Sequence, residues 1–207
     1  MQIKRILEEK WGALPSGAST FLKKATGLFI GWKLLYILVL LPLGEPDGWL
    51  VRNLGEATVW VLNASSIGGD RYNVRHIMVE KPGGRLGGDA CAQVYSSGMR
   101  ADIGIFAPCN GLELMVLAVG FILCFNGGAK RKALYVLSTI TAIFLVNVLR
   151  CSLLVMIKAA QPAYFEFAHK YLFNLVSYAI VFLIWMHYVN TLMRNISRRV
   201  TVSQQLI

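Results

Sequence analysis

Charged residues are scarce in this chain. They make up 15% of its 207 residues, where a soluble domain carries roughly 25%. Acidic residues are the scarcer kind, with 11 Asp and Glu against 21 Lys and Arg. Apolar residues make up 56% and gather in long runs, so the composition excludes a water-soluble globular enzyme. It also excludes a disordered chain, because disordered chains have too little apolar surface to bury.

Several motifs of soluble enzymes are also missing. The three histidines and four cysteines are scattered, with neither an HExxH motif nor a CxxC pair, so we expect no metal site. The sequence has no glycine-rich phosphate loop and no GxSxG motif, so we expect no cofactor. These absences leave a small membrane protein with a basic surplus that needs an explanation.

Four apolar stretches approach the length that crosses a bilayer, which takes about 20 residues. The second reaches that length only if Cys109–Gly111 belongs to it, and Leu153–Ile157 extends the third. The four stretches are Ala25–Leu43, Leu112–Phe125, Ala133–Leu149 and Tyr171–Val189. We therefore predict an all-α polytopic membrane helix bundle.

A fifth apolar segment, Leu50–Ile67, has a different pattern. Arg52 and Glu56 are spaced i,i+4, so they share one face of a helix, while the apolar residues share the opposite face. This pattern predicts an amphipathic helix that lies at the membrane interface or re-enters the bilayer, rather than a lipid-facing span. The apolar face consists of Leu50, Leu54, Ala57 and Val61.

The basic residues predict the orientation in the cell membrane, because cytoplasmic segments carry an excess of Lys and Arg. Eleven of the 21 basic residues lie before the first span, between the second and third, or after the last. Segment 44–108 holds six basic and seven acidic residues, so we place it outside. The expected order is a cytoplasmic segment 1–24, a first span 25–43, an extracytoplasmic segment 44–108, catalytic transmembrane helices 109–190 and a cytoplasmic basic tail 191–207. The surplus charge thus predicts topology and a lipid bilayer as partner, and no nucleic acid.

The outer segment contains a strand pattern. Tyr72–Glu80 mixes β-branched and aromatic residues, and Lys81–Asp89 is dense in Gly and Pro. Ala92–Phe106 then alternates loosely between apolar and polar residues. We predict a small extracytoplasmic β-hairpin over residues 72–106 that caps the outer mouth of the bundle.

Arg150 is the most informative exception to the apolar pattern, because a charge inside a span is costly and marks a functional candidate. At a rise of about 1.5 Å per residue, Arg150 lies about 26 Å from the cytoplasmic start of its helix. The same arithmetic places Cys109 about 26 Å and His169 roughly 30 Å from the cytoplasmic ends of their spans. Three separate helices therefore bring a Cys, an Arg and a His to one level near the outer face.

These three residue types suit acyl transfer through a thioester. A thiol is a poor nucleophile near neutral pH until a neighbouring cation or base favours the thiolate. Arg150 can stabilise a thiolate or an oxyanion. His169 can exchange a proton with the leaving amine and with the incoming nucleophile. The level near the outer face suits a peptide whose scissile bond emerges just outside the membrane.

Other interpretations stay open at this point. Cys124 and Cys151 are typical of small buried apolar residues, and a disulfide between Cys91 and Cys109 is an alternative in an oxidising compartment. Arg150 alone is also compatible with snorkelling to the headgroups. A non-catalytic membrane subunit or small transporter would use Arg150 in an intramembrane polar site, together with Lys33 and Glu113. Lys33 either pairs with Glu113 or snorkels from its span.

Three motifs together resemble the exosortase/archaeosortase family of membrane cysteine transpeptidases. They are Ala107-Pro-Cys109-Asn-Gly-Leu112 before a span, Asn147-Val-Leu-Arg150 near the outer end of the next long helix, and His169 before the last span. The resemblance covers roughly Trp49 to Asn190. Each motif alone is weak, and the set in this order is fairly specific.

The resemblance implies that Cys109 is the nucleophile, with Arg150 and His169 as its catalytic partners. It implies substrates that are secreted proteins with a C-terminal motif, a transmembrane helix and a basic tail. The enzyme would cleave at the motif and transfer the product to water, a lipid or a cell-surface amine. The residues expected to support the three catalytic groups are Asn110, Asn147 and Glu113.

Overall fold

The computed structural model describes residues 16–40, 46–65, 71–79, 89–96, 101–125 and 128–204. Helices dominate these ranges. Along the first half of the chain lie α2 (Ser16–Leu35), its π-helical continuation η1 (Tyr36–Leu40), α4 (Asp47–Ser65), and the strands β1 (Asn73–Val79), β2 (Asp89–Tyr95) and β3 (Ala101–Phe106). The second half holds the 3₁₀ turn η2 (Ala107–Cys109), α5 (Leu112–Cys124), α6 (Ala129–Ala160), η3 (Pro162–Tyr164), α7 (Phe165–Phe167), the π-helical η4 (Ala168–Leu172) and α8 (Phe173–Gln204).

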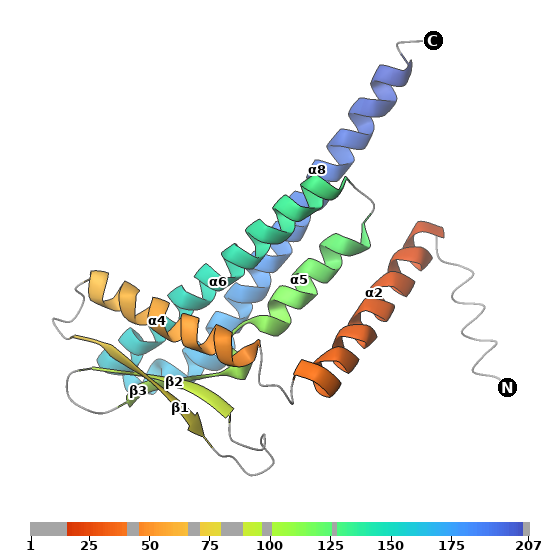
Figure 1. Ribbon diagram of the computed structural model, residues 1–207. Helices are drawn as coiled ribbons and strands as arrows, with labels where there is room; N and C mark the ends of the chain where they lie inside the picture. The colour runs from red at the N-terminus through yellow and green to blue at the C-terminus, as the bar shows by residue number, and fades with distance from the viewer. Residues whose placement is uncertain are drawn as a thin grey trace.

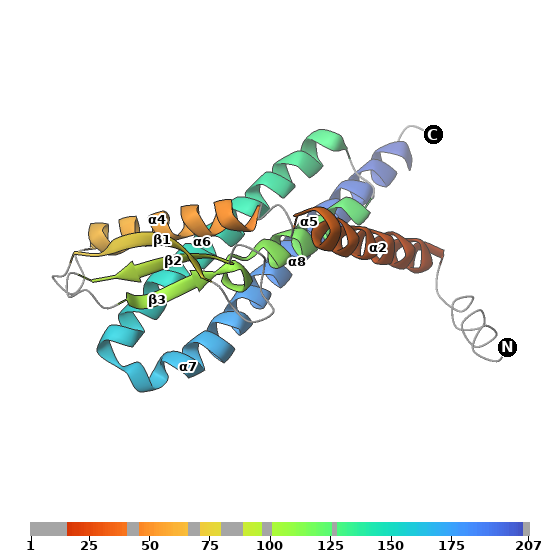
Figure 2. The same ribbon diagram turned by 60° about the horizontal axis from the view of Figure 1, so that its bottom comes forward.

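The helices form an elongated bundle with two different ends (Figure 1). At one end lie the start of α2, the α5–α6 turn and the end of α8. At the other lie α4, the sheet and the connection from α6 to α8, which Figure 2 shows folding back beneath the strands. Helices α5, α6 and α8 pack on one another, and α2 packs against α5. The bundle therefore has one purely helical end and one end covered by the sheet and α4.

Two helical runs, Ala129–Ala160 and Pro162–Thr191, are long and apolar enough to cross a membrane, and Leu112–Cys124 is a shorter apolar helix. The predicted first span is not among them within the described residues. Its helix begins at Ser16, earlier than predicted, and residues 23–40 carry Lys23, Lys24 and Lys33. The predicted end of that span, 41–43, lies outside the described residues.

The boundaries of the other apolar stretches also differ from the prediction. The third stretch and its extension form one continuous helix of 32 residues, because nothing between Leu149 and Leu153 breaks the pattern. The last helical run begins well before Tyr171. The second stretch does not extend to Cys109, since α5 begins at Leu112 after a left-handed Gly111. Adding Cys109–Gly111 to that helix was therefore wrong.

The outer segment forms a three-stranded antiparallel sheet in the order β1-β2-β3, where we expected a hairpin. The central strand β2 pairs with both neighbours, so Cys91 lies opposite Ile77 on one side and Phe106 on the other. The loose alternation over Ala92–Phe106 concealed two strands, which is why one hairpin was predicted. The predicted turn at Lys81–Asp89 falls almost wholly outside the described residues, and β2 already begins at Asp89.

Helix α4 is amphipathic, as its pattern predicts, and its apolar face is buried against protein. Leu50 and Leu54 are buried, whereas Arg52 and Glu56 are exposed. The helix packs against β2 on one side and α6 on another, which closes a core between helix and sheet. That core consists of Val51, Leu54, Leu62, Tyr72, Ala92, Val94, Ile103, Ile105, Val148, Cys151 and Val155.

Candidate functional site

Cys109 ends the turn that connects the sheet to the bundle. Pro108 is at the start of η2, where its fixed φ suits the first turn, and the Asn110 amide donates to the Ala107 carbonyl over 3.1 Å. Gly111 then adopts φ +81°, and its carbonyl accepts the first bond of α5 from Met115 over 2.9 Å. Cys109 is thus held in a tight turn at the mouth of α5, rather than within a helix.

Gly111 is required at this turn for two reasons. Its positive φ is a conformation that residues with a Cβ rarely adopt, and a Cβ built there would overlap the Asn147 amide nitrogen. We expect Gly111→Ala to lower the free energy of unfolding by about 2–4 kcal/mol. Thermal unfolding in detergent, followed by tryptophan fluorescence, measures this. Gly128→Ala is the control, because Gly128 has φ −64° and nothing within 4 Å of an added Cβ; equal losses in the two variants would contradict the explanation.

His169 lies in the π-helical turn η4, inside the last helical run. Such π turns occur often at functional sites, because they change the direction in which a side chain points. The Phe165 ring stacks on the imidazole with a centroid distance of 5.8 Å and an interplanar angle of 9°. The imidazole Nε2 lies 3.7 Å from the Cys109 Sγ. Two groups 60 residues apart in the sequence therefore form a thiol–imidazole contact.

Arg150 lines a cavity of about 790 Å³ between α2, α5 and α8. Its guanidinium makes no hydrogen bond or ion pair with any residue in the described ranges, although its charge acts on His169. Pro108 and Asn110, on either side of Cys109, also line the cavity, whereas Cys109 and His169 do not. The structure thus brings Cys109 and His169 into contact and places Arg150 on the neighbouring cavity wall.

A half-buried thiol, an imidazole and an unpaired guanidinium can together perform nucleophilic chemistry at a carbonyl. The family model of the transmembrane exosortases matches residues 11–186, which is most of the chain. The protein belongs to the transmembrane exosortase family. It is therefore a membrane protein, from a family with transpeptidase-type function that acts on secreted proteins with C-terminal sorting signals. No curated protein and no solved structure gave a match.

The three predicted supporting residues have different surroundings. Asn110 is buried, and its Oδ1 accepts a bond from the Leu112 amide over 2.8 Å. Asn147 is also buried and donates to the Ile143 carbonyl one turn earlier. Glu113 is largely exposed and pairs with Lys33. Asn110 thus bonds within the turn beside Cys109, Asn147 packs against Gly111 of that turn, and Glu113 is paired elsewhere.

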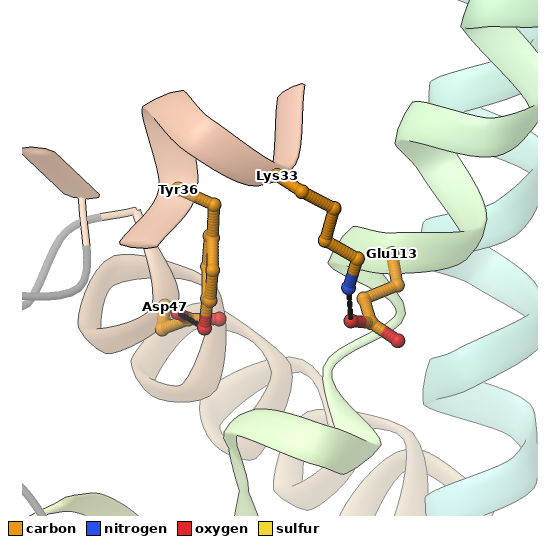
Figure 3. A network of polar contacts seen from close by, with 4 residues as sticks. All are labelled: Lys33, Tyr36, Asp47 and Glu113. Carbon is orange, nitrogen blue, oxygen red and sulfur yellow. Dashed lines mark hydrogen bonds and ion pairs between the residues drawn. The ribbon is translucent and has the colours of Figure 1, made fainter. Parts of the chain in front are cut away.

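Of the two alternatives for Lys33, the structure shows the ion pair with Glu113. The Nζ–Oε1 distance is 2.7 Å, and the side chains are 40% and 77% exposed (Figure 3). The pair links α2 to the start of α5. Neither residue bonds to Arg150 in the described part of the chain, although all three line the same cavity.

Asp47 is the residue near the site that the sequence analysis missed. It is 4% exposed at the start of α4, and it accepts hydrogen bonds from Tyr36 and Asn110. The pair Pro46-Asp47 before an amphipathic helix is a helix-start signal, since acidic residues favour the first turn. That signal predicts a helix boundary, and it carries no information about a partner 63 residues away.

The other three cysteines are buried, as expected for Cys124 and Cys151, and Cys91 is buried with them. No disulfide joins any of the four cysteines, all of which lie in the described residues, so the alternative of a Cys91–Cys109 disulfide is wrong in this structure. Cys91, Cys124 and Cys151 are 2%, 7% and 3% exposed, whereas Cys109 is half-buried. Cys109 is therefore the most accessible thiol of the four.

Proposed function

We propose that the protein is a membrane-embedded cysteine protease/transpeptidase that cleaves the C-terminal sorting tail of secreted proteins. The observation that carries this proposal is the 3.7 Å contact between the Cys109 Sγ and the His169 Nε2. The position of Arg150 on the wall of the cavity that Pro108 and Asn110 also line, and the family membership, support it. Cys109 is the nucleophile, His169 the general base and acid, and Arg150 the cation that stabilises negative charge.

The reaction has two halves. His169 accepts the thiol proton, and the Cys109 sulfur attacks the scissile carbonyl carbon, so that an oxyanion forms beside the Arg150 guanidinium. His169 returns the proton to the leaving amine, the C–N bond breaks, and a thioester remains on Cys109. Water or a lipid or cell-surface amine then attacks the thioester carbonyl carbon and gives its proton to His169. The C–S bond breaks, and His169 returns that proton to the Cys109 sulfur, which restores the thiol.

We further propose a multi-pass topology with four spans, both termini in the cytoplasm and the active site on the outer face. The arrangement of the ends supports it. The α2 start, the α5–α6 turn and the α8 end share one end of the bundle, and Lys130, Arg131 and Lys132 lie at that turn (Figure 1). The sheet and the Cys109 turn lie at the opposite end. The basic residues that begin α6 lie at this end, and an excess of Lys and Arg is typical of cytoplasmic segments, which supports the proposed orientation.

The cavity offers space for the apolar part of a substrate tail. Its wall follows α5 from Leu112 to Cys124, a distance of about 18 Å at the helical rise. The end next to Cys109 is polar, and the rest is mainly apolar. A tail that enters the bilayer beside α5 would therefore bring its scissile bond to the level of Cys109.

Selective thiol labelling tests this function without knowledge of the substrate. Membranes are treated at pH 7 with a limiting amount of iodoacetamide, and each of the four cysteines is quantified by mass spectrometry. We expect Cys109 to react at least about tenfold faster than the buried cysteines, and His169→Gln to slow it about ten- to thirtyfold, because an unassisted thiol is only a few per cent thiolate at this pH. His187→Gln, an exposed histidine on the same α8 run, is the matched control.

The same measurement decides between the enzyme and the non-catalytic alternative. A subunit or small transporter needs no activated thiol, so all four cysteines would react slowly and His169→Gln would change nothing. Within the described residues Lys33 pairs with Glu113 and not with Arg150, although all three side chains line the same cavity, so the labelling result is what separates the two functions.

A further inference from the structure

The carboxylate of Asp47 joins two elements that are distant in the sequence. Its Oδ2 accepts a hydrogen bond from the Tyr36 hydroxyl, and its Oδ1 accepts one from the Asn110 Nδ2, each over 2.7 Å. Figure 3 shows the Tyr36 side chain pointing toward Asp47, next to the Lys33–Glu113 pair. A carboxylate that is 4% exposed is costly unless its oxygens are hydrogen-bonded, so both contacts are needed for it to lie there.

Asn110 transmits this arrangement to the nucleophile. Its side chain is 1% exposed, its Nδ2 donates to Asp47, and its Oδ1 accepts from the Leu112 amide over 2.8 Å. Its backbone amide closes the turn to Ala107. Both ends of the side chain are thus satisfied, and the residue immediately before it is Cys109. Without Asp47, the buried Nδ2 of Asn110 has no hydrogen-bond partner, and leaving such a donor unpaired is costly. We expect the Asn110 side chain to shift, so that the turn that carries Cys109 loses its fixed geometry.

We propose that Asp47 is a positioning residue, which holds Asn110 and through it keeps the Cys109 thiol against His169. Tyr36 of η1 in turn holds Asp47. The proposal rests on the proposed function in taking Cys109 as the nucleophile. Asp47 itself accepts two hydrogen bonds from neutral donors and needs no contact with substrate. Its role depends on accepting those bonds, rather than on carrying charge.

The first test replaces two acidic residues of α4, Asp47 and Glu56, in the full-length protein in membranes and compares the variants. We expect Asp47→Ala to slow iodoacetamide alkylation of Cys109 about tenfold and to lower kcat for tail processing by about ten- to a hundredfold, with little change in KM. Asp47→Asn should stay within about threefold of wild type, because an amide oxygen can accept from Asn110 and its nitrogen can donate to the Tyr36 oxygen. Glu56→Ala is the control, since Glu56 is exposed on α4 and faces His76.

A reciprocal exchange tests the contact even if Asp47→Ala fails to accumulate. Asn110→Asp sets two carboxylates against each other across the 2.7 Å contact, and we expect alkylation to slow about tenfold. The double variant Asp47→Asn/Asn110→Asp restores a donor and an acceptor there and should regain the wild-type rate within about threefold. A positioning role requires this rescue, which a general loss of stability would not produce.

The outcomes separate this inference from the proposed function. Wild-type alkylation in Asp47→Ala, or no rescue in the double variant, overturns the role of Asp47 even if the protein processes tails. Rescue of alkylation in a protein that processes no tail would leave Asp47 as a positioning residue for the thiol and overturn the proposed function instead.

Discussion

Replacing Cys109 by alanine or serine will abolish cleavage of sorting tails while the protein still inserts and accumulates. Without the sulfur no thioester can form, and a serine hydroxyl beside His169 is a much weaker nucleophile. We expect kcat to fall by at least about 10³-fold, because removing the nucleophile from a set of catalytic residues typically lowers kcat by about that factor or more. The measurement is the ratio of processed to unprocessed protein for a secreted protein that ends in a motif, an apolar helix and a basic tail.

Cys91→Ala is the matched control for this experiment. Cys91 is a buried thiol of β2 outside the cavity lining, so the variant removes a thiol without touching the thiol–imidazole contact or the cavity wall. We expect it to retain more than about half of the activity, because trimming one small buried side chain has a modest cost. Normal processing by Cys109→Ala would show that the reaction does not pass through this sulfur.

Arg150→Lys will also fail, although it conserves the charge. The planar guanidinium presents five donors in a fixed fork, whereas an ammonium is a compact point charge on a flexible stem. Losing a donor to an oxyanion typically costs about 10²–10³ in kcat, and we expect a loss in that range with KM changed by less than about threefold. Single-turnover processing at several substrate concentrations separates kcat from KM.

Lys130→Gln removes a cation from the exposed start of α6 and serves as the control for charge on the same helix. It should leave kcat unchanged. If Arg150→Lys kept the wild-type kcat, a positive charge alone would be enough for catalysis, and the planar arrangement of guanidinium donors would not be needed. If Arg150→Gln kept it as well, Arg150 would have no part in the chemistry, even though it faces the cavity.

Local patterns predicted part of the fold, and their limits have a physical reason. Hydrophobic periodicity found α4 and its buried face, because burial of one helix face is visible within a few turns. Apolar length found α6 and the last helical run. The same reasoning placed Cys109 inside a helix, because runs of apolar residues say little about a left-handed glycine that stops one. It also merged β2 and β3, since strand pairing is a long-range property.

For the candidate site, counting residues along three helices predicted that Cys109, Arg150 and His169 lie at one level. The structure brings Cys109 and His169 into contact and places Arg150 on the wall of the cavity that Pro108 and Asn110, the neighbours of Cys109, also line. The count was approximate, because Cys109 is in a turn and His169 is in a π-helical segment. Whether the three residues perform the chemistry stays a prediction for the experiments above.

By itself, the sequence determined that this is a membrane protein and where its basic residues lie along the chain, and it predicted a common level for Cys109, Arg150 and His169. Those properties follow from composition, the rise of a helix per residue and the cost of burying charge. Each of them can be evaluated from neighbouring residues or along a single helix, without knowledge of how the elements pack. Only the tertiary structure decided that the Cys109 Sγ meets the His169 imidazole, and that Asp47 is held by Tyr36 and Asn110. Those contacts join residues up to 63 positions apart, and their geometry depends on how helices and strands pack together.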